Sequence, residues 1–178
     1  MKRYTDSSKQ HKIKYIYESC YAVMAYTAGK YLSDAADVED AVHNAFLSII
    51  VKIDMIDTSD ESRLKSLCCI IAKNKAVDIH RRHDKWTQPE GEWEEELLDD
   101  RSEPAEIIAG EQAHEIIART IKGLSDTYRD VCTLKYLDGF KEWEMARLLD
   151  LPPKTVNLRI MRGKQLIRDT LRKEGIHE

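Results

Sequence analysis

The sequence is poor in the residues that common enzyme motifs require. Its 178 residues include only seven glycines and four prolines, and the patterns GxGxxG, GxxxxGK[ST] and GxSxG do not occur in it. Phosphate-cradling loops and a nucleophile elbow of these types are therefore excluded. The four cysteines form no CxxC pair and no Cys/His spacing of a zinc site, so we expect reduced, mostly buried thiols and no disulfide framework.

Long apolar runs are also missing. No stretch of about 18 apolar residues is available to cross a bilayer, and 34% of the residues are charged. Residues Met1 to Tyr15 are basic and are not followed by the apolar segment of a secretory signal. The sequence therefore predicts a cytoplasmic protein without membrane insertion.

The net charge of -4 conceals blocks of alternating sign. Residues 32–62 carry eight acidic residues against one lysine, residues 63–85 have a balance of +5, residues 86–111 of -9, and residues 141–173 of +5. Two basic blocks separated by an acidic one indicate two surfaces that face a polyanion and a segment kept off nucleic acid. The alternative is that these blocks are only solvated helix faces.

Apolar residues recur at the helical period and predict an all-α fold. We expect a helical domain in residues 1–86, an acidic flexible linker in residues 87–103 and a second helical domain in residues 104–178. The linker segment lacks the apolar periodicity of a packed element. The individual helices are predicted at Tyr15–Tyr31, Asp34–Ile53, Leu64–Arg82, Ala105–Ile121, Asp126–Tyr136, Lys141–Leu149 and Pro153–Lys173, with Ser33 or Asp34 capping the second and Ser125 the fifth.

The most specific local pattern is a helix-turn-helix in residues 142–162. Ala146 is the small residue expected where the two helices cross, Pro153 suits the opening turn of the second helix, and Asp150 stands where a glycine commonly relieves strain. The inward stripe of the second helix is Val156, Ile160, Gly163 and Ile167, and its outward residues are Lys154, Asn157, Leu158, Met161, Arg162 and Gln165. This outward face suits a DNA groove, whereas an ordinary helical hairpin with a packed outer face is the alternative.

The predicted second helix, Asp34–Ile53, is apolar on two sides. Leu47 and Val51 lie on the polar face, in line with Asp40. Such a helix either sits inside a bundle or docks on a partner, and its acidic character favours docking. Coverage of Leu47 and Val51 by the N-terminal segment is the alternative.

These segments together resemble the extracytoplasmic-function (ECF) sigma factors of bacterial RNA polymerase, in the sigma-70 family. The resemblance covers about Tyr15 to Leu171 and is carried by YLSDAADVEDAV with Phe46, by AKNKAVDIHRR and by EMARLLDLPPKTVNLRIMR, in the family's order. It implies a sigma-2-like three-helix bundle and a sigma-4-like helix-turn-helix domain. The implied partners are core RNA polymerase, through the clamp helices of its largest subunit and its flap region, promoter DNA, and an anti-sigma factor.

The resemblance implies roles for residues of the second helix. Asp40 and Leu47 are the strongest candidates for docking on the clamp helices, while Phe46 suits a core position equally well. His43 and Asn44 stand where the family often has Gln and Glu. The full set implied for polymerase docking is Asp37, Glu39, Asp40, His43, Asn44, Phe46 and Leu47.

Two further segments match the family's promoter-binding regions. The loop Asp57 to Ser62 corresponds to the loop that captures a flipped base of the minus-ten element, and Asp78 is either a DNA contact or a partner of Arg81 or Arg82. The minus-ten set is Asp57, Ser59, Asp60, Ser62, Lys73, Asn74, Asp78, Arg81 and Arg82. Leu67 and Ile70 replace a frequent tryptophan and arginine, which implies altered melting contacts.

The second helix of the helix-turn-helix matches the segment that reads the minus-35 element. The base-facing positions are Asn157, Leu158, Met161 and Arg162, with Lys154, Arg159 and Lys164 on phosphates. The complete minus-35 set is Lys154, Thr155, Asn157, Leu158, Arg159, Met161, Arg162 and Lys164. Leu158 and Asn157 replace a frequent serine and a frequent basic residue, so the preferred sequence is expected to differ.

No catalytic role, cofactor or metal site is predicted. The only close histidine pair, His80 and His83, lies in a basic segment without matching carboxylates or cysteines. Two other functions compete with a sigma factor. A free-standing helix-turn-helix regulator would need a dimer and enough positive charge to bind duplex alone, which this acidic chain without a heptad seam does not offer. A helical adaptor without a DNA role would leave the outward face of Pro153–Lys173 unexplained.

Overall fold

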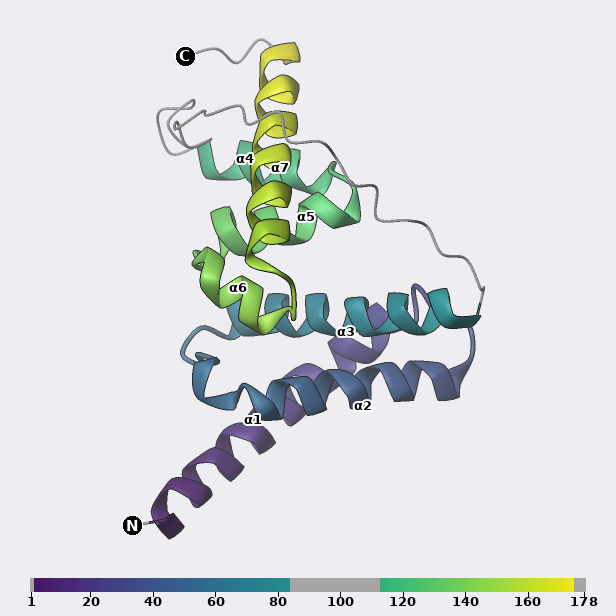
Figure 1. Ribbon diagram of the computed structural model, residues 1–178, viewed down its shortest axis with the longest axis vertical. Coiled ribbons are helices and arrows are strands. Elements are labelled where there is room, and N and C mark those ends of the chain that lie inside the picture. Colours follow the sequence, from purple (N-terminus) through teal and green to yellow (C-terminus); the bar gives the residue numbers. More distant parts are fainter. Residues whose placement is uncertain (1, 84–112, 175–178) are drawn as a thin grey trace. The chain divides into compact units, whose positions relative to one another are not determined.

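The computed structural model describes residues 2–83 and 113–174 (Figure 1). They fall into two compact units, one within Met1–Gln88 and one within Pro89–Glu178, and each is described by itself. Every regular element in these two ranges is a helix, which confirms the all-α prediction. The predicted domain boundaries and the acidic linker lie outside the described residues.

The N-terminal unit is a bundle of three long helices with one short turn of 3-10 helix. Its elements are α1 (Lys2–Ala28), α2 (Ala35–Val51), η1 (Ile53–Met55) and α3 (Glu61–His83). Helix α3 packs against both α1 and α2, so its middle is enclosed on several sides. The residues 67–72 are all buried apart from the half-buried Cys69, as the apolar run predicts. The core of this unit therefore follows α3.

Helix α1 is longer than the sequence pattern predicts. It begins at Lys2 instead of near Tyr15, and it ends at Ala28. Its first turns carry no apolar stripe, because they extend past the packed part of the bundle (Figure 1). Local contacts support the helix there, including a bond between the His11 ring Nδ1 and the Ser7 carbonyl at 2.6 Å. Helical periodicity in a sequence reveals a helix only through its buried face, and none of the described side chains at residues 7–15 is buried.

The ends of α2 and α3 are set by aspartate caps. The Asp34 carboxylate accepts hydrogen bonds from the main-chain N–H groups of Ala36 and Asp37, as expected for an N-cap. Helix α2 ends at Val51, before the predicted Ile53, which instead opens η1. Helix α3 begins at Glu61 inside the predicted loop, because Asp60 accepts a hydrogen bond from the main-chain N–H of Arg63 at 3.0 Å.

The C-terminal unit contains α4 (Ala113–Lys122), α5 (Asp126–Cys132), the π-helical turn η3 (Thr133–Leu137), α6 (Glu142–Leu148) and α7 (Pro153–Lys173). Helix α7 packs against α4, α5 and α6 and forms the centre of the unit. The sequence predicts a continuous α-helix at residues 126–136, and this prediction is wrong in one respect. The helix ends in a π-helical turn, in which the main-chain N–H of Asp138 donates to the carbonyl of Thr133. Ser125 holds the N-cap position of α5 without a side-chain bond.

Candidate polymerase and promoter interfaces

The outer face of α2 combines acidic and apolar side chains. Leu47 is 48% exposed, Ile50 40% and Val51 84%. These three residues share one face at helical spacing, and the exposed Asp40 lies on the same line two turns earlier. In the described part of the chain no segment covers Leu47 or Val51, so the alternative of burial under the N-terminal segment is wrong. Ile50 was missed from sequence, although its spacing of three residues from Leu47 would have identified it.

Two residues of the predicted docking set are placed differently from the rest. Phe46 is only 7% exposed and packs against the Tyr17 ring with centroids 5.0 Å apart, so it belongs to the core and is not a contact residue in this conformation. Asp37 is half-buried and lies 3.7 Å from the His83 ring. Glu39, Asp40, His43 and Asn44 are exposed. The exposed part of the predicted docking set therefore belongs to a stripe that starts at Glu39 and continues to Val51.

The α2–α3 loop is held in shape by its own polar side chains. The Asp57 carboxylate accepts a hydrogen bond from the main-chain N–H of Ser59 at 2.9 Å. This bond, with the Ser59 hydroxyl and the nearby charges of Arg63 and Lys12, lowers the pKa of Asp57. Asp60 caps α3, and the side chains of Ser59 and Ser62 are exposed at the tip beside the carboxylates. The loop presents hydrogen-bonding groups on a backbone that is already ordered.

Helix α3 carries a polar face towards its C-terminal end, on which Asp78 and Arg81 are exposed and Asn74 is half-buried. Asn74, Asp78 and Arg81 share that face at helical spacing, and Arg82 Nε donates to the main-chain carbonyl of Asp78 at 3.2 Å. Asp78 is therefore a partner of Arg82 through its main chain, which leaves its carboxylate on the surface. Lys73 is only 8% exposed in this conformation, so its place in the minus-ten set stays a prediction that its burial does not favour.

The substitutions expected to change promoter melting are core positions in this fold. Leu67 is 1% exposed and Ile70 is 8% exposed. Both side chains are buried and stabilise the packing of α3, and their expected effect on promoter melting stays a prediction. The loop and the Arg81 end are also not one site. Helix α3 has 23 residues, and a rise of 1.5 Å per residue separates its ends by roughly 30 Å.

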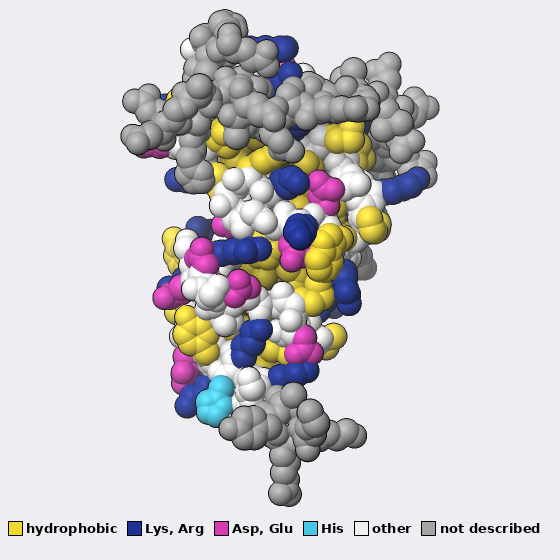
Figure 2. Space-filling model, turned by 90° about the vertical axis from the view of Figure 1, so that its left-hand side faces the viewer, with side chains coloured by type: hydrophobic (Ala, Val, Ile, Leu, Met, Phe, Trp, Pro, Cys, Tyr) yellow, Lys and Arg dark blue, Asp and Glu magenta, His cyan; other side chains and the backbone are white. Residues whose placement is uncertain are grey.

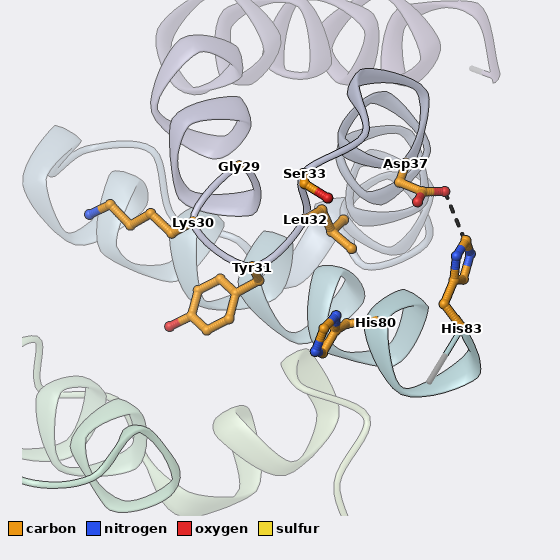
Figure 3. A pocket seen from close by; sticks show the side chains of 8 residues that line it. All are labelled: Gly29, Lys30, Tyr31, Leu32, Ser33, Asp37, His80 and His83. Atoms are coloured by element: carbon orange, nitrogen blue, oxygen red, sulfur yellow. Dashed lines mark ion pairs between the residues drawn. The ribbon is translucent and has the colours of Figure 1, made fainter. Parts of the chain in front are cut away.

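A pocket of about 400 Å³ lies at the other end of the N-terminal unit from the α2–α3 loop. It is lined by Gly29, Lys30, Tyr31, Leu32, Ser33, Asp37, His80 and His83. Figure 3 shows the two histidines rising from α3 and the Asp37 carboxylate pointing at the His83 ring. Among the described residues, His, Cys, Asp and Glu side chains form no group of three that could hold a metal ion. The contact between Asp37 and His83 joins the start of α2 to the end of α3.

The helix-turn-helix has the turn that its sequence predicts. Asp150 adopts a positive φ of 57°, the left-handed conformation expected after α6. The N–H of Leu151 donates to the carbonyl of Ala146 at 3.0 Å and closes the end of the first helix. Pro153 occupies the first turn of α7, where no main-chain N–H is required. Trp143 on α6 is 54% exposed, an apolar surface residue that the sequence pattern did not single out.

Helix α7 separates a buried stripe from a polar face. Val156, Ile160, Gly163 and Ile167 are buried, as predicted. Lys154 and Asn157 are exposed, and the half-buried members of the predicted minus-35 set are Thr155, Leu158, Arg159, Met161, Arg162 and Lys164. The alternative of a fully packed outer face is wrong, since none of these side chains is buried. The face offers cations, an amide and apolar groups together, which is the chemistry of base reading.

The segments of both units match known protein families. A model of Sigma-70 region 2 matches residues 16–86, and a model of Sigma-70 region 4 matches residues 114–167. The ECF RNA polymerase sigma-E factor of Escherichia coli (strain K12) is 30% identical over 139 residues, which are 75% of this chain and 73% of that protein. The chain belongs to the ECF RNA polymerase sigma factors. The ECF RNA polymerase sigma factor SigW of Bacillus subtilis (strain 168) is 28% identical over 165 residues, 88% of this chain and 83% of the relative.

A solved structure is similar at lower identity. It is the co-crystal structure of the sigma factor RpoE in complex with the anti-sigma factor NepR from Bartonella quintana, with a TM-score of 0.37 and 18% identity over 85% of this chain and 91% of that one. Because ECF sigma factors are initiation factors that carry out no catalysis themselves, this sigma factor is not an enzyme. The described helices include none that is both long and apolar enough to cross a membrane.

Proposed function

We propose that this chain binds core RNA polymerase through the exposed face of α2 and directs the enzyme to promoters that its two units recognise. The N-terminal unit engages and melts the minus-ten element, and the C-terminal unit reads the minus-35 element. The proposal assigns one task to each polar or apolar face described above. It follows from membership of the ECF sigma factors together with the chemistry of those faces.

The observation that carries the proposal is the apolar stripe on an acidic helix. Leu47, Ile50 and Val51 lie next to acidic side chains on the outside of a folded unit. Exposed aliphatic groups of this kind are costly in a protein that acts alone, and they mark a surface that a partner covers. The partner that we propose is the clamp-helix region of the largest polymerase subunit, with Asp40 and Glu39 pairing with basic residues around the apolar centre.

The minus-ten element is assigned to the α2–α3 loop and the C-terminal face of α3. The loop, with Asp57, Ser59, Asp60 and Ser62, would receive an unstacked base, and Asn74, Asp78, Arg81 and Arg82 would lie along the upstream duplex. The roughly 30 Å between the ends of α3 corresponds to about nine bases at 3.4 Å each. One helix can therefore follow both the single-stranded and the double-stranded part of the element.

The minus-35 element is assigned to the polar face of α7. Arg162 and Asn157 have the donor and acceptor groups that distinguish bases in the major groove, and Leu158 and Met161 suit thymine methyl groups. Lys154, Thr155, Arg159 and Lys164 lie where phosphate contacts fix the register. The C-terminal unit would also reach the flap region of the polymerase.

An anti-sigma factor is the second protein partner that we propose. The stripe of α2 is open to solvent in the free chain, so an inhibitor that covers it would block polymerase binding by competition for one surface. Because polymerase and chromosomal DNA share the bacterial cytoplasm, the function assigns the chain to that compartment.

One experiment tests the function directly. The purified full chain is mixed with core RNA polymerase, the complex is isolated, and transcripts made from genomic DNA fragments are sequenced at their 5′ ends. A stable complex and start sites that share two upstream elements are expected. Binding of duplex by the chain alone as a dimer, without a polymerase complex, would favour a free-standing regulator and contradict the proposal.

A further inference from the structure

The first turns of α1 form a basic segment outside the region that matches the sigma family. The match to Sigma-70 region 2 starts at residue 16, whereas α1 starts at Lys2. Before Tyr15 the chain has five basic residues and one acidic residue: Lys2, Arg3, Lys9, Lys12 and Lys14 against Asp6. The backbone of this stretch belongs to α1, so Lys9, Lys12 and Lys14 are carried by the same helix as the packed part of the bundle.

Two of these lysines lie at the α2–α3 loop. Lys9 Nζ is 2.5 Å from Asp54 Oδ2 in η1, directly before the loop. Lys12 is close enough to Asp57 to help lower the pKa of that carboxyl, after the larger effects of Ser59 and Arg63. Figure 1 shows the first turns of α1 and the α2–α3 connection at the same end of the unit. The segment is therefore a neighbour of the loop that is assigned to the melted strand.

The exposed carboxylates at this end of the unit would repel the phosphates of a bound DNA strand. Asp54, Asp57, Asp60 and Glu61 are all exposed there. The lower half of Figure 2, which views this end, shows acidic, basic and apolar side chains side by side. A phosphate backbone that approaches the loop would meet these carboxylates unless cations intervene. The lysines of α1 supply such cations from a separate helix.

We propose that Lys9 and Lys12 bind phosphates of the single DNA strand that enters the α2–α3 loop. The inference rests on the proposed function and adds to it a contact outside the family-matched region. Lys9 exchanges its bond to Asp54 for a phosphate, and Lys12 remains near the loop and adds a second cation. The side chains of Lys9 and Asp54 are 45% and 70% exposed, and exposed ion pairs are weak, so the exchange is easy.

The same helix provides a matched control. Lys14 lies five residues after Lys9, a rotation of about 140° around the helix, so it faces elsewhere. Its Nζ is 3.7 Å from the Glu18 carboxylate, and its side chain is 72% exposed. Lys14→Gln removes the same charge as Lys9→Gln from the same helix but away from the loop.

The experiment uses the full chain in complex with core polymerase. The probe is a fork-junction DNA whose promoter sequence is selected with the wild-type complex, with one strand single-stranded from the minus-ten element downstream. Affinity is measured from 0.1 to 1 M salt for the wild type, Lys9→Gln, Lys9→Gln/Lys12→Gln, Lys14→Gln and Asp54→Asn. Each lost phosphate contact to a single strand reduces the salt slope by about 0.7. In the double variant, the slope of log affinity against log salt concentration should be smaller by about 1.4. Its affinity at 0.1 M salt should be lower by roughly 20-fold.

Asp54→Asn separates a DNA contact from a structural one. If Lys9 binds phosphate, removing its competitor Asp54 strengthens DNA binding, so Asp54→Asn and Lys9→Gln have opposite effects. If Lys9 only holds η1 in place, both variants weaken binding, and that result would overturn the inference. An unchanged slope in the double variant, or an equal loss in Lys14→Gln, would overturn it as well. Failure of the wild-type complex to bind the fork would instead reject the proposed function.

Discussion

Gly163 of α7 lies against the sulfur of Cys132 in α5, so closely that a Cβ atom at residue 163 would overlap Sγ. Both residues are buried, and burial raises the pKa of the Cys132 thiol to about 12, so the sulfur is a neutral packing atom. Because α7 also carries the minus-35 set, the position of that face depends on this contact. The glycine is required for close approach and not for an unusual backbone conformation.

Gly163→Ala is expected to destabilise the C-terminal unit. Overpacking of a tight contact costs about 1 to 3 kcal/mol, against which alanine regains up to about 1 kcal/mol of helix propensity. The net loss should lower the melting temperature measured by circular dichroism by several degrees.

The double variant Gly163→Ala/Cys132→Ala tests the cause. Removing the sulfur makes room for the new methyl group, so the pair should be no less stable than Cys132→Ala alone. If the double variant instead loses as much stability as the two single variants together, the sulfur is not what destabilises Gly163→Ala.

The parts of the structure that local chemistry determines could be read from sequence. The left-handed Asp150, the Pro153 start and the Asp34 cap each depend on a few neighbouring residues. The buried stripe of α7 followed from helical periodicity in the same way.

The residues that sequence reasoning misplaced depend on neighbours from other helices. Phe46 is buried because Tyr17 of α1 packs on it, and Lys73 is buried because α3 is enclosed by the bundle. The first turns of α1 gave no apolar signal, since their described contact with the rest of the unit is polar, the ion pair between Lys9 and Asp54. Family resemblance locates such positions along the chain but does not say which side chains reach solvent.

Promoter specificity should follow the polar face of α7. Arg162→Ala is expected to cost about 1 to 3 kcal/mol and to relax preference at one minus-35 position, because a base contact concerns one base pair. Lys164→Ala should weaken all promoters similarly, as a phosphate contact does. Binding of the polymerase complex to a library of minus-35 variants measures both effects. Equal losses without a change of preferred sequence in either variant would refute the base-reading role of Arg162.

The acidic linker lies outside the described residues. We expect its negative charge to contribute to assembly of the polymerase complex or to early transcript synthesis. About 16 residues can span roughly 50 Å when extended, enough to join units on separate promoter elements. Replacing Glu92, Glu94, Glu95, Glu96, Asp99 and Asp100 by Ser and Gly at fixed length should impair complex assembly or early transcript synthesis, most clearly at low salt. Run-off transcription over a range of salt measures this. Wild-type behaviour at every salt concentration would leave the acidity as a solubility feature.

Leu47→Asp should abolish most polymerase binding without unfolding the chain. The side chain is 48% exposed, so a carboxylate there remains solvated in the free chain, whereas the proposed docking would bury it. Placing a charge at the centre of an apolar contact should cost about 2 kcal/mol or more, which is a loss of roughly 30-fold in affinity. Titration of labelled chain with core polymerase measures the loss, and thermal melting checks the fold.

Leu166→Asp is the matched control for this variant. Leu166 is a leucine of α7 with 40% exposure that lies outside the α2 stripe and outside the minus-35 set, so the same change should leave binding through α2 intact. A large drop in the melting temperature of Leu47→Asp would show that Leu47 supports the bundle. Because α2 already exposes Ile50 and Val51 beside it, we expect the melting curves of wild type and Leu47→Asp to coincide while only the wild type binds tightly.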